Sequence, residues 1–72
     1  MTSILFTTGP ESEVRRAAER LIPVTFDVEE DSAFPGFDVA VDLFDDADAE
    51  DLARQLSETL HRPVRTLESL DV

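Results

Sequence analysis

The sequence contains no cysteine, which excludes disulfides, zinc–thiolate centres and thiol nucleophiles. It also lacks lysine: its six basic residues are all arginine, against 17 acidic residues, and the formal net charge is -11. Nucleic acids and anionic membranes are bound through clustered cations, so their phosphates would repel this chain. The composition therefore predicts no nucleic-acid partner and no membrane partner.

Long hydrophobic runs are absent as well. No segment approaches the roughly 20 apolar residues of a membrane span, and the opening MTSILFTTGP lacks the basic region that begins a signal peptide. These absences predict a cytoplasmic protein. Because 42% of its 72 residues are hydrophobic, the chain is expected to fold as a single domain over residues 1–72, unlike a disordered acidic tail.

Two segments have the apolar spacing of amphipathic helices, and each ends before a proline, Pro23 or Pro63. The apolar positions are Val14, Ala17, Ala18, Leu21 and Ile22 in the first, and Ala49, Leu52, Ala53, Leu56 and Leu60 in the second. Thr8 and Glu11 have the spacing of a capping box for the first helix. Asp46 or Asp48 is the predicted N-cap of the second helix.

Four segments are predicted strands: residues 3–8, 24–29, 37–44 and 64–68. The first, SILFTT, is apolar on both faces, as expected of a central strand. The second and third, VTFDVE and FDVAVDLF, alternate apolar and polar residues and are joined by a glycine-containing loop, which indicates an antiparallel hairpin. The last alternates less cleanly and is predicted to be an edge strand, which Leu70 and Val72 either extend or pack beneath.

The order strand, helix, strand, strand, helix, strand predicts an α+β fold. Two strand–helix–strand crossovers close naturally into a ferredoxin-like βαββαβ sandwich, a four-stranded antiparallel sheet with two helices on one face. The first and third strands would be central. The polar sides of the alternating strands, with Asp27, Glu29, Asp38 and Asp42, would form the face that no helix covers.

Acidic residues are spread over every predicted element and are concentrated in DLFDDADAED, residues 42–51. Two carboxylates about 6 Å apart repel by roughly 0.7 kcal/mol in water, and by roughly 0.1 kcal/mol at 1 M salt. The acidic surface and the absence of lysine resemble small acidic proteins of haloarchaea that accumulate salt. That resemblance implies a concentrated-brine habitat and identifies no functional family.

The residues do not assemble a recognisable reaction centre, and we expect no enzyme activity, no cofactor and no metal site. An EF-hand beginning at Asp46 would have Asp51 where glycine is needed and Ser57 at its last ligand position. The serines have no recognisable His/Asp partners. His61, the only histidine, is interpreted as a residue that compensates the dipole at a helix C-terminus.

The predicted function is protein interaction or self-association, with a homodimer or another protein as partner. The proposed partner contacts are Phe34, in the hairpin loop, and the carboxylates Asp27, Asp38 and Asp42. Phe34 could instead fold back over the end of the core. On the uncovered sheet face, the outward positions of the central strands are expected to be Ala40, Asp42 and either Leu5 or Thr7. The alternative is a small-molecule-sensing regulatory module, because the order of elements resembles ACT-like domains.

Overall fold

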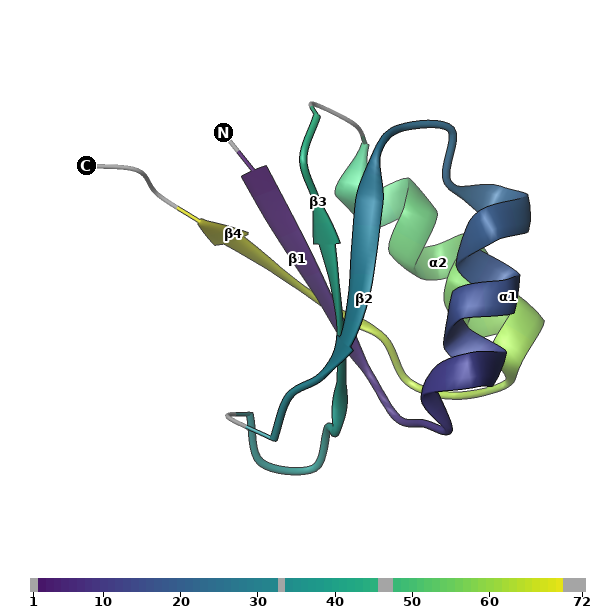
Figure 1. Cartoon of the computed structure of the whole chain (residues 1–72), viewed down its shortest axis with the longest axis vertical. Helices are drawn as coiled ribbons and strands as arrows, with labels where there is room; N and C mark the ends of the chain where they lie inside the picture. Colours follow the sequence, from purple (N-terminus) through teal and green to yellow (C-terminus); the bar gives the residue numbers. More distant parts are fainter. Residues whose placement is uncertain (1, 33, 46–47, 70–72) are drawn as a thin grey trace.

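The computed structural model describes residues 2–32, 34–45 and 48–69 of the chain. The elements follow the predicted order (Figure 1): β1 (Thr2–Thr7), α1 (Glu11–Leu21), β2 (Phe26–Glu30), β3 (Val39–Leu43), α2 (Ala49–Leu60) and β4 (Arg65–Ser69). Neither described helix is long and apolar enough to cross a membrane. Leu70 and Val72, predicted to extend the last strand or to pack beneath it, lie outside the described residues.

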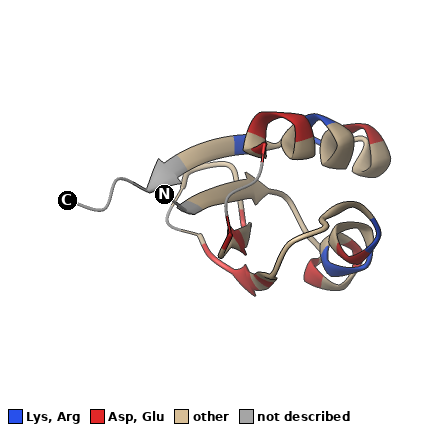
Figure 2. Cartoon of the chain, turned by 90° about the horizontal axis from the view of Figure 1, so that it is seen from above, with Lys and Arg blue, Asp and Glu red and all other residues tan. Residues whose placement is uncertain are grey.

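The four strands form one antiparallel sheet in the order β2-β3-β1-β4. This order confirms that the first and third strands are central and that the last strand is at an edge. Both helices lie on the same side of the sheet (Figures 1 and 2), so the architecture is α+β with one helical layer and one sheet layer. We call the side opposite α1 and α2 the open face.

The hydrophobic core lies between the sheet and the two helices. Alternate residues of each strand point into it, because side chains along a strand alternate between the two faces. Leu5 of β1 is paired with Val41 of β3, and Val41 is paired with Val28 of β2, so these three side chains share the helical face. The helices contribute Val14, Ala17, Ala18, Leu52, Ala53, Leu56 and Leu60.

Helix α1 begins differently from the prediction. Its N-cap is Pro10, which makes no side-chain cap, and the carbonyl oxygen of Pro10 accepts from the N–H groups of Glu13 and Val14 at 3.1 and 3.3 Å. The capping box predicted for Thr8 and Glu11 is therefore wrong: Thr8 lies two residues before the cap. The apolar spacing nevertheless located the helix correctly, because the buried face determines where the helix packs.

Helix α2 agrees with its predicted ends. The Asp48 side chain accepts a hydrogen bond from the Asp51 N–H at 3.2 Å, which confirms Asp48 as the N-cap. Asp46, the other candidate, lies outside the described residues. At the other end His61 adopts a left-handed conformation with φ 55°, and Ser57 Oγ donates to the Arg62 carbonyl at 2.6 Å. His61 is thus the C-cap, exposed at the end of the helix.

Candidate interaction surface

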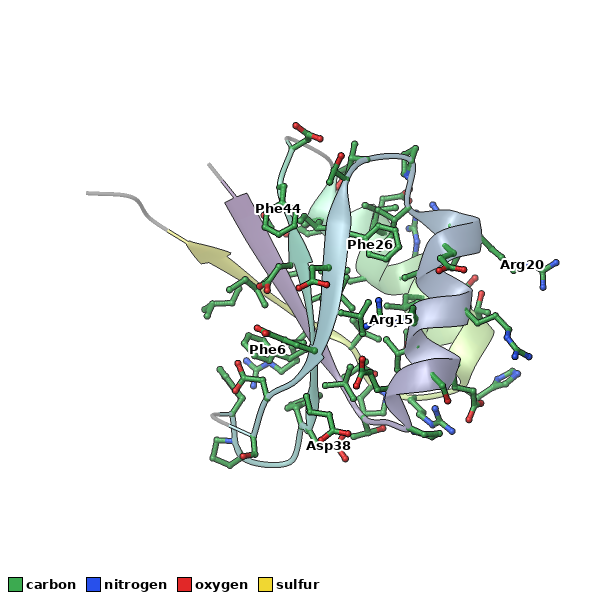
Figure 3. All side chains as sticks on the ribbon, viewed as in Figure 1. Phe6, Arg15, Arg20, Phe26, Asp38 and Phe44 are labelled. Carbon is green, nitrogen blue, oxygen red and sulfur yellow. The ribbon has the colours of Figure 1, made fainter. Side chains whose placement is uncertain are left out.

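The open face carries the other half of the strand side chains. Two rows cross the sheet from β2 to β4: one reads Asp27, Asp42, Ile4, Leu67, and the other reads Glu29, Ala40, Phe6, Arg65. Figure 3 shows Phe6 and Phe44 on the side of the sheet away from the helices, and Phe26 between the sheet and the helices. Each row begins with a carboxylate at β2; the first becomes apolar at β1, and the second becomes apolar at β3 and ends at Arg65 of β4.

The central strand β1 has the opposite orientation to the one predicted. Leu5 and Thr7 are fully buried on the helical face, and Ile4 and Phe6 occupy the open face. Thr7 Oγ1 donates to the carbonyl oxygen of Pro63 at 3.0 Å, which satisfies this buried hydroxyl. The outward positions of the two central strands are therefore Ala40, Asp42, Ile4 and Phe6.

An aromatic group covers one end of the open face. The Phe34 ring, from the β2–β3 loop, lies 5.2 Å from the Phe6 ring, and Phe37 meets Phe34 edge-on at 6.0 Å. The Arg65 guanidinium carbon lies 5.4 Å from the centre of the Phe34 ring. Phe34 therefore folds back onto the sheet, where it helps to bury Phe6, and its own side chain remains partly exposed. Its role as a partner contact stays a prediction.

The alternation in the predicted strand 37–44 would place Phe37 on the core side, and this placement is wrong. The strand β3 begins at Val39, and the Phe37 N–H donates to the Phe34 carbonyl at 3.1 Å in a turn. Gly36, with φ +88°, supplies the left-handed backbone of this turn. The Phe37 ring consequently joins Phe34 instead of the core between sheet and helices.

Beside the aromatic group, large apolar side chains on the open face remain accessible. Leu67 is 45% exposed, and Phe44, directly after β3, is 55% exposed. Ile4 lies between them in the sheet and is partly buried. We call Ile4, Leu67 and Phe44 the apolar strip; Phe6, the next residue on this face of β1, is only 5% exposed and lies beneath Phe34.

The β2 side of the open face is acidic. The carboxylates of Asp27, Glu29 and Asp42, which we call the acidic triad, have oxygen atoms within 4.8 Å of one another. Coulombic repulsion from Asp42, followed by a hydrogen bond shared with it, raises the pKa of Glu29 above its ordinary value. Figure 2 shows the acidic segments at this side of the sheet. The triad is therefore a compact site of negative potential.

Asp38 lies apart from the acidic triad, although the alternation placed it on the same face. It precedes β3, at the end of the sheet (Figure 3), and its carboxylate accepts a hydrogen bond from the Gly9 N–H at 2.7 Å. A Cβ on Gly9 would lie 3.1 Å from Val39 Cγ2, so the loop packs closely against β3. Asp38 thus fixes the β1–α1 loop, and its role as a partner contact stays a prediction.

Three carboxylate oxygens could attract a cation, but Ca²⁺ takes six to eight oxygen ligands. In the chain as described, one carboxylate oxygen from each of Asp27, Glu29 and Asp42 lies within 4.8 Å of the others, and two of these side chains are exposed. A guanidinium or ammonium group needs no such coordination shell and fits the same carboxylates. The triad therefore has the geometry to attract an organic cation, and a metal ion there would need further oxygens from the same carboxylates or from water.

The edge strand β2 is partly covered by helix α1. Arg15 Nη2 donates to the Val28 carbonyl of β2 at 2.8 Å and to Glu11 Oε1 at 2.7 Å. The hydrogen bond to Glu11 is the main cause that raises the pKa of Arg15, so the guanidinium remains charged. Because Arg15 occupies an outward carbonyl of this edge (Figure 3), the side chain hinders another strand from pairing there.

Comparisons with known proteins gave no relatives: no family model, no curated protein and no solved structure matches this chain.

Proposed function

We propose that this chain is a ferredoxin-like domain that acts by associating with another protein or with itself through its open face, without enzymatic activity. The observation that carries the proposal is the apolar strip on the face away from the helices. The side chains of this strip lie outside the core between sheet and helices, and two of them, Leu67 and Phe44, are 45% and 55% exposed. A partner that covers them would remove apolar surface from water, which favours association.

The topology supports this proposal by analogy. A four-stranded antiparallel sheet in the order β2-β3-β1-β4, with both helices on one side, is the arrangement expected of the ferredoxin-like split pattern. Modules that recognise RNA use the corresponding face to stack bases on aromatic residues. Here Asp27, Glu29 and Asp42 on that face would repel phosphates, so a protein partner fits the charge better.

The proposal includes the medium: a cytoplasm that contains concentrated salt, as in haloarchaea. With a net charge of -11, the chain carries repulsion that molar salt screens within about 3 Å. Hydrophobic contacts of the kind offered by Leu67 and Phe44 are not weakened by such screening. An association surface that combines exposed apolar side chains with screened acids is suited to that medium.

The alternative, an ACT-like sensor, would use the β1–α1 loop. There the Gly9 N–H, a donor that a ligand would need, is already taken by the Asp38 carboxylate. Glu11 and Glu13 follow in the first turn of α1 and disfavour anionic ligands. The sensor remains a prediction from the order of elements, and the geometry favours association.

The test is the native mass of the tagged chain in an extract of the cells that produce it, at about 2 M KCl. The unmodified chain is expected to migrate well above its own 8.0 kDa. The double variant Phe44→Asn/Leu67→Asn should migrate as the free domain, whereas Glu19→Gln/Glu58→Gln, on the helices, should behave as the unmodified chain. Free migration of the unmodified chain, or unchanged complexes with the Phe44/Leu67 variant, would refute the proposal.

A further inference from the structure

We propose that the occupant of the open face is an amphipathic helix of another protein with apolar side chains along one face and arginine or lysine along one flank. The helix would lie along β1, with its apolar face on the apolar strip and its cations over the acidic triad. This inference rests on the proposed function and deepens it by stating the chemistry of the partner.

The two halves of the face have the spacing that such a helix requires. Neighbouring strands are about 4.8 Å apart, so the Asp42 position lies one strand from Ile4 and two strands from Leu67. A helix about 10 Å across covers roughly two strands. Centred over β1 and β4, it leaves β2 and β3 at its flank, where arginine or lysine side chains reach the carboxylates while their stems cover apolar surface.

The acidic half receives little counter-charge from the described residues, because Arg15, which is attracted by Asp27, is hydrogen-bonded to Glu11 and to the Val28 carbonyl. The described base on the open face is Arg65, whose guanidinium lies over the Phe34 ring at the opposite edge of the sheet. Asp27, Glu29 and Asp42 crowd one another enough to raise the pKa of Glu29. At molar salt a cation would be attracted only in direct contact with these carboxylates, where the neighbouring apolar contact excludes water and salt ions and strengthens the attraction.

A second copy of the chain fits this surface less well. Each copy has a net charge of -11, and stacking two open faces about a twofold axis would bring only Arg65 of each copy to three carboxylates of the other. The remaining negative charge would be buried without partners, which is strongly unfavourable. Charge complementarity therefore selects a cationic partner over self-association.

The probe for this inference is a stapled helical peptide of leucine, alanine and arginine. A helix of about 14 residues is about as long as the six-residue strand β1, and it would begin at the aromatic group that covers Phe6 and extend past Ile4. Its control is the same peptide with every arginine replaced by citrulline, which keeps the shape of the side chain and removes its charge. Binding is followed by amide NMR shifts of the ¹⁵N-labelled chain at about 2 M KCl.

The arginine peptide is expected to saturate shifts at Ile4, Phe6, Asp42 and Leu67 at concentrations below about 1 mM, and the citrulline peptide to bind at least roughly tenfold more weakly. The variant Asp27→Asn/Glu29→Gln/Asp42→Asn should lose that tenfold preference. Glu19→Gln/Glu50→Gln/Glu58→Gln removes the same charge from the helices and should keep the preference. Removing repelling charges is not expected to unfold either variant.

Three results would overturn the inference: no saturable shifts with the arginine peptide, equal binding of the citrulline peptide, or an equal loss in the helix variant. Concentration-dependent shifts of the same residues without peptide would also overturn it, because a second copy would then be the occupant. If any of these occurs while the Phe44/Leu67 variant still abolishes the native complex, the proposed function stands and the partner has another chemistry. If the complex itself is absent, the proposed function fails.

Discussion

The two phenylalanines at the rim of the open face should differ sharply in their contribution to stability. Phe34 packs on Phe6 at 5.2 Å and lies under the Arg65 guanidinium at 5.4 Å. An aromatic pair contributes about 0.5–1.5 kcal/mol beyond its buried area, and an exposed cation–π contact about 0.5–1 kcal/mol. Phe34→Ala should therefore lower the free energy of unfolding by about 2 kcal/mol, which corresponds to roughly 10 °C in a domain of this size.

Phe44 is the matched comparison, since it is 55% exposed at the other end of the apolar strip. Phe44→Ala should change the free energy of unfolding by less than about 0.5 kcal/mol. Because the chain contains no tryptophan or tyrosine, far-UV circular dichroism with urea is the suitable assay, at constant molar KCl. A Phe34→Ala loss below about 0.5 kcal/mol, or an equal loss in Phe44→Ala, would refute the assignment of Phe34 as a cover for Phe6.

Three further predictions concern charge. Circular dichroism should show the chain folded in molar KCl and unfolding as salt is removed, because repulsion between charges about 6 Å apart grows roughly sevenfold on desalting; equal stability in both media would contradict this. Repulsion from Asp42 raises the pKa of Glu29 in the folded chain above its ordinary value of 4.5. Ionised Glu29 therefore lowers the stability of the fold at neutral pH, and this loss is relieved as the pH falls toward 4.5 and Glu29 takes up a proton. Glu29→Gln should thus be more stable than the unmodified chain at neutral pH, and this difference should shrink as the pH falls toward 4.5. A difference that does not depend on pH would disprove the repulsion between Glu29 and Asp42. Asp48→Ala should cost about 1 kcal/mol in urea unfolding, with Asp48→Asn nearly neutral; equal losses would argue against the cap.

For β2 and β3, whose residues alternate between apolar and polar, the sequence predicted which side chains face the helices. For β1, which is apolar on both faces, it did not. In β2 and β3 the polar residues marked the outward side, so Val28 and Val41 were correctly placed inward. SILFTT has apolar residues at both odd and even positions, so the alternation could not show whether Leu5 or Phe6 faces the helices. Ile4 and Phe6, the outward residues of β1, were missed for that reason. The signal that could have found Phe6 is pairing: it lies opposite Ala40, already assigned outward.

The hairpin loop shows a second limit of sequence patterns. Alternation continued from Val39 back to Phe37, but the backbone turns at Gly36 and the strand begins two residues later. Local periodicity does not record where pairing stops, because that depends on the partner strand and on the loop. Similarly, the capping pattern at Thr8 did not locate the start of α1, because the N-cap is Pro10, two residues later.

The most direct test of whether the open face binds a partner is photo-cross-linking from single positions, at molar KCl, in an extract of the cells that produce the chain. A photoreactive phenylalanine analogue is placed either at Leu67, on the open face, or at Glu58, an exposed position of α2. If a partner binds the open face, position 67 should give a discrete cross-linked product and position 58 should give none. A product from position 58 with none from position 67 would contradict binding through the open face.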